Sequence, residues 1–568
     1  MHRPLDLEMR PTHQHRPLEG GAGGGRVSTG GALCAFTYRH ASKIFALLAV
    51  GLVIATVLTR HPSESASGKG GFAGLSGPLF GGGGSSTATV GGAYECIPNV
   101  DYQDFGSSFK GVSRRDCAAL CNAMPNCRVW QHSTKAGGSC NTRYNNYTSF
   151  VSAYEGVESC LQTTHNPPDM TAFLGIAHWQ GCYFKSAKPF LLDGADEVRR
   201  LGAKVLKVAF NFHEPWNDYP WHSPEWPTDT WRTWTPPPVD VAKHPYWKSL
   251  FKMDFDTYIL IAYSNVARSS PDPEDWKSWL DPWYWVFQDP TSQQLRDETA
   301  QFYELTEHLL TTYPNKTFVL QMWEGDWTLR QDLPVDQRYN FTAPVSRAKA
   351  DRMVKWLAAR QAGVTKARKA VGDKAGSTKV YHAAEVNLVR DSAQEHAKKG
   401  RVVVRQDMVT TVLPRVALDM ISYSAYDSTL IPEACTGAFF EAVRFIQRMH
   451  RRTAEAPEKA VYVGEFGVNT MSTDWDDSME KIKNAVNVGA AAGLAYLIYW
   501  QMFDNALNPK GKEYYGLDRC DSRMVAKGPV YDQQYLEGFF LQHPDMEYLR
   551  PPASYLEKML HDRFDEVR

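Results

Sequence analysis

The sequence predicts an α/β fold: a (β/α)8 barrel preceded by a small disulfide-rich α+β module, a flexible linker and one transmembrane helix. Three observations predict it. Eight short apolar runs alternate with helix-length segments from Phe173 onward, six of the ten cysteines crowd into one stretch before them, and one long apolar run lies near the N-terminus. The 568 residues also exceed what a single hydrophobic core supports.

The N-terminal part of the chain predicts a membrane anchor. Residues 1–40 are rich in Gly, Pro, His and Arg without periodicity, which is typical of a disordered tail. The segment 41–60 contains an uninterrupted apolar run that suits one signal-anchor helix. Because Arg39 and Lys43 precede that run, the positive-inside rule leaves the N-terminus in the cytosol. The alternative is a cleaved signal peptide with small residues near 65–67.

Both alternatives export the folded part. With the anchor, we expect a single-pass type II membrane protein of the secretory pathway or cell surface, whose C-terminal domains are lumenal or extracellular. Residues 61–93 are dominated by Gly, Ser, Ala and Thr, the composition of a flexible linker. Glycosylation triplets follow at Asn146, Asn315 and Asn340, all on the predicted lumenal side.

Six cysteines mark the segment 94–162: Cys96, Cys117, Cys121, Cys127, Cys140 and Cys160. In an exported chain such an even, dense set indicates a disulfide framework. A zinc site is the alternative, but there is no paired CxxC motif and only His132 lies nearby. Cys117 and Cys121 are four residues apart, so one helical face can present both to two separate strands. Spacing alone leaves all the possible connectivities open.

This segment resembles an apple/PAN module. The matching pieces are Asn99-Val100-Asp101-Tyr102 after the first cysteine and the run Cys117-Ala118-Ala119-Leu120-Cys121-Asn122. The resemblance implies nested disulfides, which pair Cys96 with Cys160, Cys117 with Cys140, and Cys121 with Cys127. Apple/PAN modules bind proteins or carbohydrates and are not enzymes, so it also implies a protein or glycan ligand, or a spacing role.

The segment 171–568 predicts the barrel. Its apolar runs read as parallel strands buried on both faces, and helix-length amphipathic stretches separate them. The predicted strands are 173–179, 204–212, 257–263, 318–323, 380–384, 419–424, 460–464 and 495–500. The clearest predicted helices are 193–201, 295–312, 346–370, 438–452 and 479–492.

Polar side chains collect at the ends of these strands, where barrel enzymes place their chemistry. Glu324 follows the fourth strand and Glu465 the seventh. This placement suits two carboxylates acting on one sugar. Further candidates for substrate contact are His178, Trp179, Trp323, Glu385, Asn387, Tyr426 and Trp500.

The layout resembles clan A glycoside hydrolases, which are retaining enzymes. The best-matching pieces are Gly464-Glu465-Phe466-Gly467, Ser422-Tyr423-Ser424-Ala425-Tyr426 and Tyr499-Trp500. The resemblance implies that Glu324 is the acid/base and Glu465 the nucleophile. It also implies that Tyr426 hydrogen-bonds the nucleophile and that Trp500 lies under the sugar.

One position departs from the clan, which has Asn immediately before the acid/base where this chain has Trp323. Asn387 or Glu385 could replace its contact to the sugar, or turnover could be lost. Asp326 is a rival for the acid role. We expect Trp323 and Trp327 to surround Glu324 with apolar groups that keep it protonated, and Tyr426 to keep Glu465 ionised.

Long loops follow the second and third strands and carry many of the tryptophans: Trp216, Trp221, Trp226, Trp231, Trp234, Trp276, Trp279, Trp283 and Trp285. They suit an extended glycan cleft, or pack on one another. Cys182, Cys435 and Cys520 also follow strands, and two of them are expected to pair. The net charge of −1 without a basic cluster excludes nucleic acid as a partner. No metal-ligand spacing or phosphate-binding loop stands out, so no metal or cofactor is expected.

The sequence therefore predicts an O-glycosyl hydrolase with a two-carboxylate retaining mechanism and a glycan or polysaccharide substrate, acting at the cell surface or in the secretory lumen. The alternative is a non-catalytic, membrane-anchored receptor for carbohydrate or protein, built on the same barrel.

Overall fold

The computed structural model describes residues 94–102, 107–124, 127–134, 138–143, 150–162, 167–179, 188–210, 219, 236–266, 288–330, 333, 345–403, 407–430, 437–468, 475–502 and 551–561. The predicted tail, signal-anchor and linker, residues 1–93, lie outside this part of the chain and stay predictions. Within the described part, no helix combines the length and apolar character that crossing a membrane requires.

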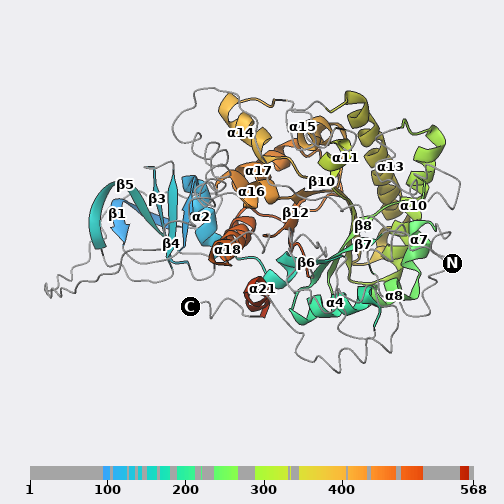
Figure 1. Ribbon diagram of the computed structural model, residues 1–568, viewed down its shortest axis with the longest axis horizontal. Coiled ribbons are helices and arrows are strands. Elements are labelled where there is room, and N and C mark those ends of the chain that lie inside the picture. The colour runs from blue at the N-terminus through green and yellow to red at the C-terminus, as the bar shows by residue number, and fades with distance from the viewer. Residues whose placement is uncertain are drawn as a thin grey trace, which may run out of the picture.

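The N-terminal unit is one antiparallel sheet with a helix packed on it (Figure 1). The strand order is β1-β5-β3-β4-β2. The strands are β1 (Tyr94–Tyr102), β2 (Ser108–Lys110), β3 (Val129–Ser133), β4 (Ser139–Arg143) and β5 (Phe150–Gln162), and the helix is α2 (Arg114–Ala123). Ser113 caps α2, because its side chain accepts the backbone N–H of Asp116.

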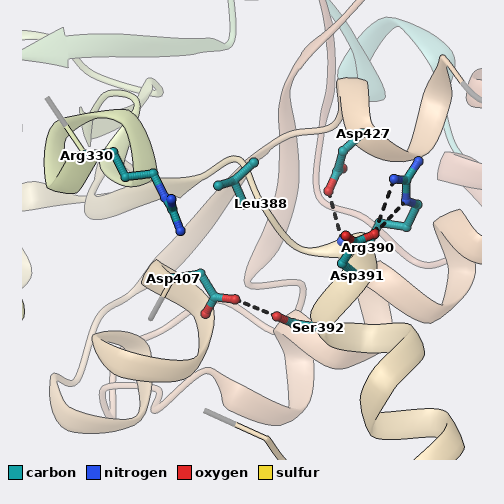
Figure 2. A pocket seen from close by; sticks show the side chains of 7 residues that line it. All are labelled: Arg330, Leu388, Arg390, Asp391, Ser392, Asp407 and Asp427. Carbon is teal, nitrogen blue, oxygen red and sulfur yellow. Dashed lines mark hydrogen bonds and ion pairs between the residues drawn. The ribbon is translucent and has the colours of Figure 1, made fainter. Parts of the chain in front are cut away.

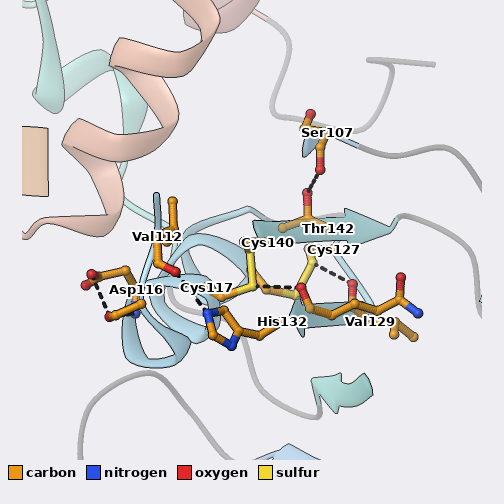
Figure 3. Close-up of a disulfide and its surroundings, with 12 residues drawn as sticks. Ser107, Val112, Asp116, Cys117, Cys127, Val129, His132, Cys140 and Thr142 are labelled. Atoms are coloured by element: carbon orange, nitrogen blue, oxygen red, sulfur yellow. Dashed lines mark hydrogen bonds between the residues drawn. A yellow bond between two sulfur atoms is a disulfide. The ribbon is translucent and has the colours of Figure 1, made fainter. Parts of the chain in front are cut away.

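Three disulfides tie this small unit together. They join Cys96 to Cys160, Cys117 to Cys140, and Cys121 to Cys127, which are the pairs that the apple/PAN resemblance implies. The first joins β1 to β5. The second joins α2 to β4, and Figure 3 shows this disulfide between Cys117 and Cys140. We expected the two cysteines of α2 to bond to two separate strands. The third disulfide differs, because Cys127 lies just before β3.

Eight parallel strands form a closed barrel, which confirms the predicted (β/α)8 barrel. Around the barrel the order is β10-β11-β12-β13-β6-β7-β8-β9, so each strand pairs with its neighbours in sequence. The strands are β6 (Leu174–His178), β7 (Val205–Phe210), β8 (Thr257–Ala262), β9 (Thr317–Met322), β10 (Lys379–Val386), β11 (Met420–Ser424), β12 (Val461–Phe466) and β13 (Leu497–Tyr499).

Helices surround this barrel on the outside (Figure 1). The longer ones are α4 (Phe190–Arg200), α10 (Ser292–Thr312), α13 (Arg347–Val371), α14 (Arg390–Lys399), α17 (Gly437–Met449), α18 (Trp475–Ala491) and α21 (Pro551–His561). The short ones are α3 (Met170–Phe173), α7 (Pro238–Ala242), α8 (Pro245–Phe251), α11 (Gly325–Arg330), α15 (Met408–Thr411) and α16 (Tyr426–Thr429), with 3-10 turns at Gly372–Ala375 and Leu413–Arg415. All five predicted helices are present, with ends shifted by a few residues.

The N-terminal unit packs against the barrel through α2, which lies beside α17 and α18 (Figure 1). Both terminal nitrogens of the Arg444 guanidinium bond the Asp116 carboxylate, with Nη1 at 3.0 Å from Oδ2. Gly437 at the start of α17 meets the Gly111 carbonyl so closely that a Cβ there would lie 1.7 Å from that oxygen. Only glycine fits this contact.

Candidate active site

Glu465 lies at the end of β12 and is 1% exposed. Its Oε1 accepts hydrogen bonds from Lys207 Nζ at 2.9 Å and from Trp323 Nε1 at 2.6 Å. Its Oε2 accepts a longer one, 3.4 Å, from Ser424 Oγ. The carboxylate is therefore held from three sides, by β7, by the end of β9 and by β11.

A bulge in β12 turns Glu465 inward. Tyr462 points into the barrel, where its hydroxyl donates to Gln321 Oε1 at 2.7 Å, so strict alternation would turn Glu465 outward. The register with β11 skips one residue, because Tyr423 pairs with Val463 but Ser424 pairs with Glu465. Such an extra residue re-aims the side chains that follow it.

The skipped residue is Gly464, and its lack of a side chain is required. A Cβ at this position would lie 2.0 Å from Ser422 Oγ and 2.7 Å from Glu385 Oε2. The glycine of the Gly464-Glu465 motif thus allows a third carboxyl to approach the backbone beside the seventh-strand glutamate.

Lys207 is the buried cation of the site, although it was not among the predicted site residues. It lies in β7 and is fully buried. Besides Glu465, its ammonium bonds the Gly464 carbonyl at 3.1 Å and lies 3.5 Å from Glu385 Oε2. The signal that could have found it is a lone lysine inside an otherwise apolar strand, which needs a buried anion as partner.

Glu385, in β10, is the third buried carboxyl. Its Oε2 accepts from Ser422 Oγ at 2.7 Å and from Gln321 Nε2 at 2.9 Å. Its Oε1 accepts the backbone N–H of Glu324 at 3.1 Å. Burial, ahead of the opposing effect of Lys207, raises the pKa of Glu385 to about 7. Glu385 therefore contacts the backbone of Glu324 and the lysine that bonds Glu465.

Glu324 follows β9 and has a left-handed backbone, with φ at 49°. Positive φ is rare for a residue with a Cβ and here breaks the strand alternation between Trp323 and Glu324. Trp323 bonds Glu465, and the charge of Glu465 also acts on Glu324, so both consecutive side chains serve one centre. Burial first, then the charges of Glu465 and Glu385, raise the pKa of Glu324 well above its usual range.

Gly325 allows this turn to lie against β10. A Cβ at Gly325 would lie 2.6 Å from the Glu385 carbonyl and 2.8 Å from Met408 Cε. The backbone that carries Glu324 is thus pressed against the strand that carries Glu385.

Three tryptophans from different strand ends gather beside the carboxyls. The rings of Trp179 and Trp323 meet edge to face at 4.6 Å, and those of Trp179 and Trp500 at 5.5 Å. Lys207 Nζ lies 5.3 Å from the centre of the Trp500 ring. The predicted aromatic residues at the ends of β6, β9 and β13 are therefore brought together.

His178 does not lie in this centre, although it was predicted to contact substrate. Its ring packs outward against α4, where its Nε2 lies 3.0 Å from the Phe190 carbonyl. A Cβ at Gly194 would lie 2.2 Å from its Cε1, so the ring fills a fitted slot. Burial lowers the pKa of His178 to about 4. The alternation of β6 explains the miss, since Trp179 faces inward and His178 therefore faces outward.

Asp326, the proposed rival acid, holds loops instead. Its Oδ2 accepts the backbone N–H of Asn387 at 2.7 Å and of Leu388 at 3.2 Å, and its Oδ1 accepts that of Met408 at 2.7 Å. In the opposite direction, Asn387 Oδ1 accepts the backbone N–H of Asp326 at 3.3 Å. Both side chains fasten α11 to the end of β10, and the predicted sugar contact of Asn387 stays a prediction.

Tyr426 lies half-buried at the start of α16. Its predicted bond to Glu465 stays a prediction, whereas Ser424 supplies a bond from the same strand end. The charged partner of Glu465 is Lys207, whose ammonium lies 2.9 Å from Oε1.

A small pocket lies beside the loop that follows β10, lined by Arg330, Leu388, Arg390, Asp391, Ser392, Asp407 and Asp427 (Figure 2). Asp427 Oδ2 accepts the backbone N–H groups of Val389 and Arg390, each at 2.9 Å. Burial, with the nearby charge of Asp326, raises the pKa of Asp407 to about 7. These acidic groups support the loop between β10 and α14.

Most of the remaining predicted residues lie outside the described part of the chain. Asn315 is exposed at the turn before β9, at the barrel end opposite the carboxyls, while Asn146 and Asn340 lie outside the described residues. So do Cys182, Cys435, Cys520 and the nine loop tryptophans named above. Within the described ranges, Cys96, Glu158 and Cys160 have the spacing of metal ligands, but a disulfide joins the two sulfurs.

No protein-family model matches the chain, and neither does any curated protein. Among solved structures, the chain is similar to a Bacteroidetes-affiliated GH5 cellulase, with 14% identity and a TM-score of 0.36 over 70% of this chain and 93% of that one. It is also similar to a beta-glycosidase from Pyrococcus horikoshii, with 12% identity and a TM-score of 0.39 over 69% and 94%.

A third similar structure is a GH1 beta-glucosidase from the fungus Humicola insolens in complex with glucose. The identity is 10% and the TM-score 0.38, over 69% of this chain and 98% of that one. These similarities are distant, so the functional case depends on the contacts of Glu324 and Glu465.

Proposed function

We propose that the chain is a retaining glycoside hydrolase that acts on a glycan or polysaccharide. The observation that supports this most is that two neighbouring carboxyls have different electrostatic environments. Glu465 forms an ion pair with Lys207 at 2.9 Å, whereas burial and like charge raise the pKa of Glu324. Retention chemistry needs one ionised and one protonated carboxyl on the same bond.

In the first step, the Glu465 carboxylate attacks the anomeric carbon while the bond from that carbon to the glycosidic oxygen breaks. Glu324 gives its proton to the departing oxygen. In the second step, the ionised Glu324 takes a proton from water, whose oxygen attacks the same carbon and releases Glu465. Both glutamates return to their starting states.

The side chains around the pair suit a sugar. Trp179, Trp323 and Trp500 together form an apolar wall next to Glu465. Flat aromatic faces pack well on the C–H faces of a pyranose, and they also exclude water from the reacting bond.

One observation favours the second candidate, a non-catalytic receptor. Trp323 stands where the resemblance expects Asn, and with Lys207 it occupies the same oxygen of Glu465. Because the two short bonds are on Oε1 and only the 3.4 Å bond from Ser424 is on Oε2, the carboxylate would react through Oε2. If that oxygen is out of reach of a bound sugar, the barrel binds glycan without cleaving it.

The proposed setting is the cell surface or the lumen of the secretory pathway. The apolar segment 41–60, the preceding basic residues and the linker 61–93 support a type II anchor. The helix-on-sheet unit with three nested disulfides supports an apple/PAN-like module, whose ligand would be a protein or a glycan.

The test is a panel of aryl glycosides offered to the full-length protein. We expect one or more to be hydrolysed, with NMR showing the retained anomer as first product. Glu465→Gln should lower turnover by a factor on the order of 10³ or more while sugar binding persists. Glu304→Gln, an exposed glutamate on α10, is the control. Binding without turnover across the panel would favour the receptor, and an inverted product would contradict the mechanism.

A further inference from the structure

Glu385 sits between the two predicted catalytic glutamates without being either of them. One of its oxygens bonds the Glu324 backbone at 3.1 Å, and the other lies 3.5 Å from the Lys207 ammonium. That same ammonium bonds Glu465 at 2.9 Å. A single side chain in β10 therefore links the turn that carries the acid to the cation that pairs with the nucleophile.

We propose that Glu385 is a positioning residue of this centre, which fixes the left-handed turn at Glu324 and, by sharing Lys207 with Glu465, controls the protonation of Glu324. This proposal deepens the proposed hydrolase function and rests on it for its kinetic readout. Glu385 touches neither leaving oxygen nor anomeric carbon in the mechanism, and it acts through Glu324 and Lys207.

The backbone contact supplies the positional part. A non-glycine residue at φ 49° is held in a sparsely populated conformation, which neighbouring contacts must stabilise. The Glu385 carboxyl accepts the backbone N–H of Glu324. The next residue, Gly325, lies directly against the backbone carbonyl of Glu385. A hydrogen bond to a charged acceptor is stronger than one to a neutral acceptor.

The charges around Glu385 supply the electrostatic part. The titratable groups that act on it or feel its charge are Lys207 from β7, Tyr263 after β8, Glu324 after β9, and Tyr462 and Glu465 from β12. Lys207 is the one cation among these described neighbours. Three buried carboxyls thus share one positive charge, so the ionisation of any two of them disfavours the ionisation of the third.

The direction of the coupling follows from the signs. A negative charge on Glu385 raises the pKa of Glu324 and so keeps the acid protonated to higher pH. Removing the Glu385 charge also leaves Lys207 with one fewer nearby anion. The positive charge of Lys207 then favours the ionised form of Glu324 more strongly. Without the Glu385 charge, Glu324 should therefore lose its proton at lower pH.

The experiment compares pH profiles of the full-length protein with those of Glu385→Gln. The alkaline limb of kcat/KM, where Glu324 ionises, should move to lower pH by about one pH unit, the effect of one removed neighbouring charge. Asp407→Asn is the matched control, because this carboxyl is also buried with a pKa of about 7 but contacts Ser392 and Thr410 instead. Its limb should not move. A lower rate with an unmoved limb in Glu385→Gln would overturn the proposal.

A second variant, Ser422→Ala, tests the same coupling if Glu385→Gln does not fold. Ser422→Ala keeps all three carboxyls but removes a 2.7 Å bond that lowers the pKa of Glu385. Glu385 then stays neutral to higher pH, so the limb should move in the same direction by a smaller amount. Movement toward higher pH would contradict the proposal.

A direct titration separates this proposal from the proposed function. Carboxyl-labelled glutamate followed by 13C NMR reports Glu324, whose signal is assigned by its loss in Glu324→Gln. If no glycoside is hydrolysed but the Glu324 titration moves to lower pH in Glu385→Gln, the hydrolase fails and the coupling stands. If hydrolysis occurs and the titration does not move, the coupling fails and the hydrolase stands.

Discussion

Trp323 and Glu465 are joined across the barrel by a hydrogen bond of 2.6 Å from the indole N–H to Oε1, although they lie 142 positions apart in sequence. Trp323 directly precedes the acid candidate, so the turn after β9 is bonded to the nucleophile candidate. The two carboxyls therefore cannot be displaced independently. Lys207 binds the same oxygen and ties β7 into the arrangement.

Removing the shared cation should strongly destabilise the fold. In Lys207→Met, two buried carboxyls, Glu385 and Glu465, lose their counter-charge, and we expect a loss of about 3–5 kcal/mol in unfolding free energy. Urea denaturation measures it. The control is Lys204→Met just before β7, whose partner Asp254 is largely exposed, where roughly 1 kcal/mol or less should be lost. Equal losses in both variants would show that the buried cluster is not held by Lys207.

His178 should make stability sensitive to acid. Burial lowers its pKa from 6.5 to about 4, so the folded state binds fewer protons than the unfolded state between these values. Its contribution is complete above pH 6.5 and is lost as the pH falls, by about 3 kcal/mol at pH 4. His178→Asn should flatten the pH dependence of the urea midpoint over that window. Parallel curves for the two proteins would contradict a buried, neutral His178.

The disulfide pairing can be read directly. Proteolysis of the unreduced protein followed by mass spectrometry should give peptides that link Cys96 to Cys160, Cys117 to Cys140, and Cys121 to Cys127. The helix α2 separates the partners of its two cysteines, because Cys117 reaches β4 and Cys121 reaches the segment before β3. A peptide joining Cys117 to Cys127, or free thiols at these six positions, would refute the arrangement.

A methyl group at Gly437 should separate the N-terminal unit from the barrel. Its Cβ would lie 1.7 Å from the Gly111 carbonyl, and both atoms belong to or adjoin regular backbone that cannot yield cheaply. We expect Gly437→Ala to speed proteolytic cleavage between the units without changing the barrel. Glu441→Ala, an exposed position on the same helix, serves as comparison. Equal cleavage rates in the two variants would mean that the contact is not close.

The barrel could be predicted because its strands are nearly continuous apolar runs, which only burial on both faces explains. The predicted fifth strand covers 380–384, whereas β10 runs from Lys379 to Val386 with Glu385 turned inward. A charged residue can lie inside this strand because the buried side chains of Lys207, Gln321 and Ser422 satisfy its carboxyl group. Such partners come from distant strands and leave no local signal.

The two glutamates could be predicted from their strand ends, but how they come to face inward could not. Glu465 depends on a one-residue bulge at Gly464, and Glu324 on a positive φ. Both break the two-residue alternation on which strand patterns are read. The same alternation, applied without the structure to β6, could not tell that His178 faces α4 while Trp179 faces the centre.

The most direct test of the central claim is to trap the covalent intermediate. A 2-deoxy-2-fluoro glycoside of the hydrolysed sugar, carrying a good leaving group, forms the glycosyl-enzyme but releases it slowly. Peptide mass mapping should then place one sugar on Glu465, and the adduct should be absent in Glu465→Gln. An adduct on Glu324 or Glu385, or steady hydrolysis with no adduct on any carboxyl, would contradict the account.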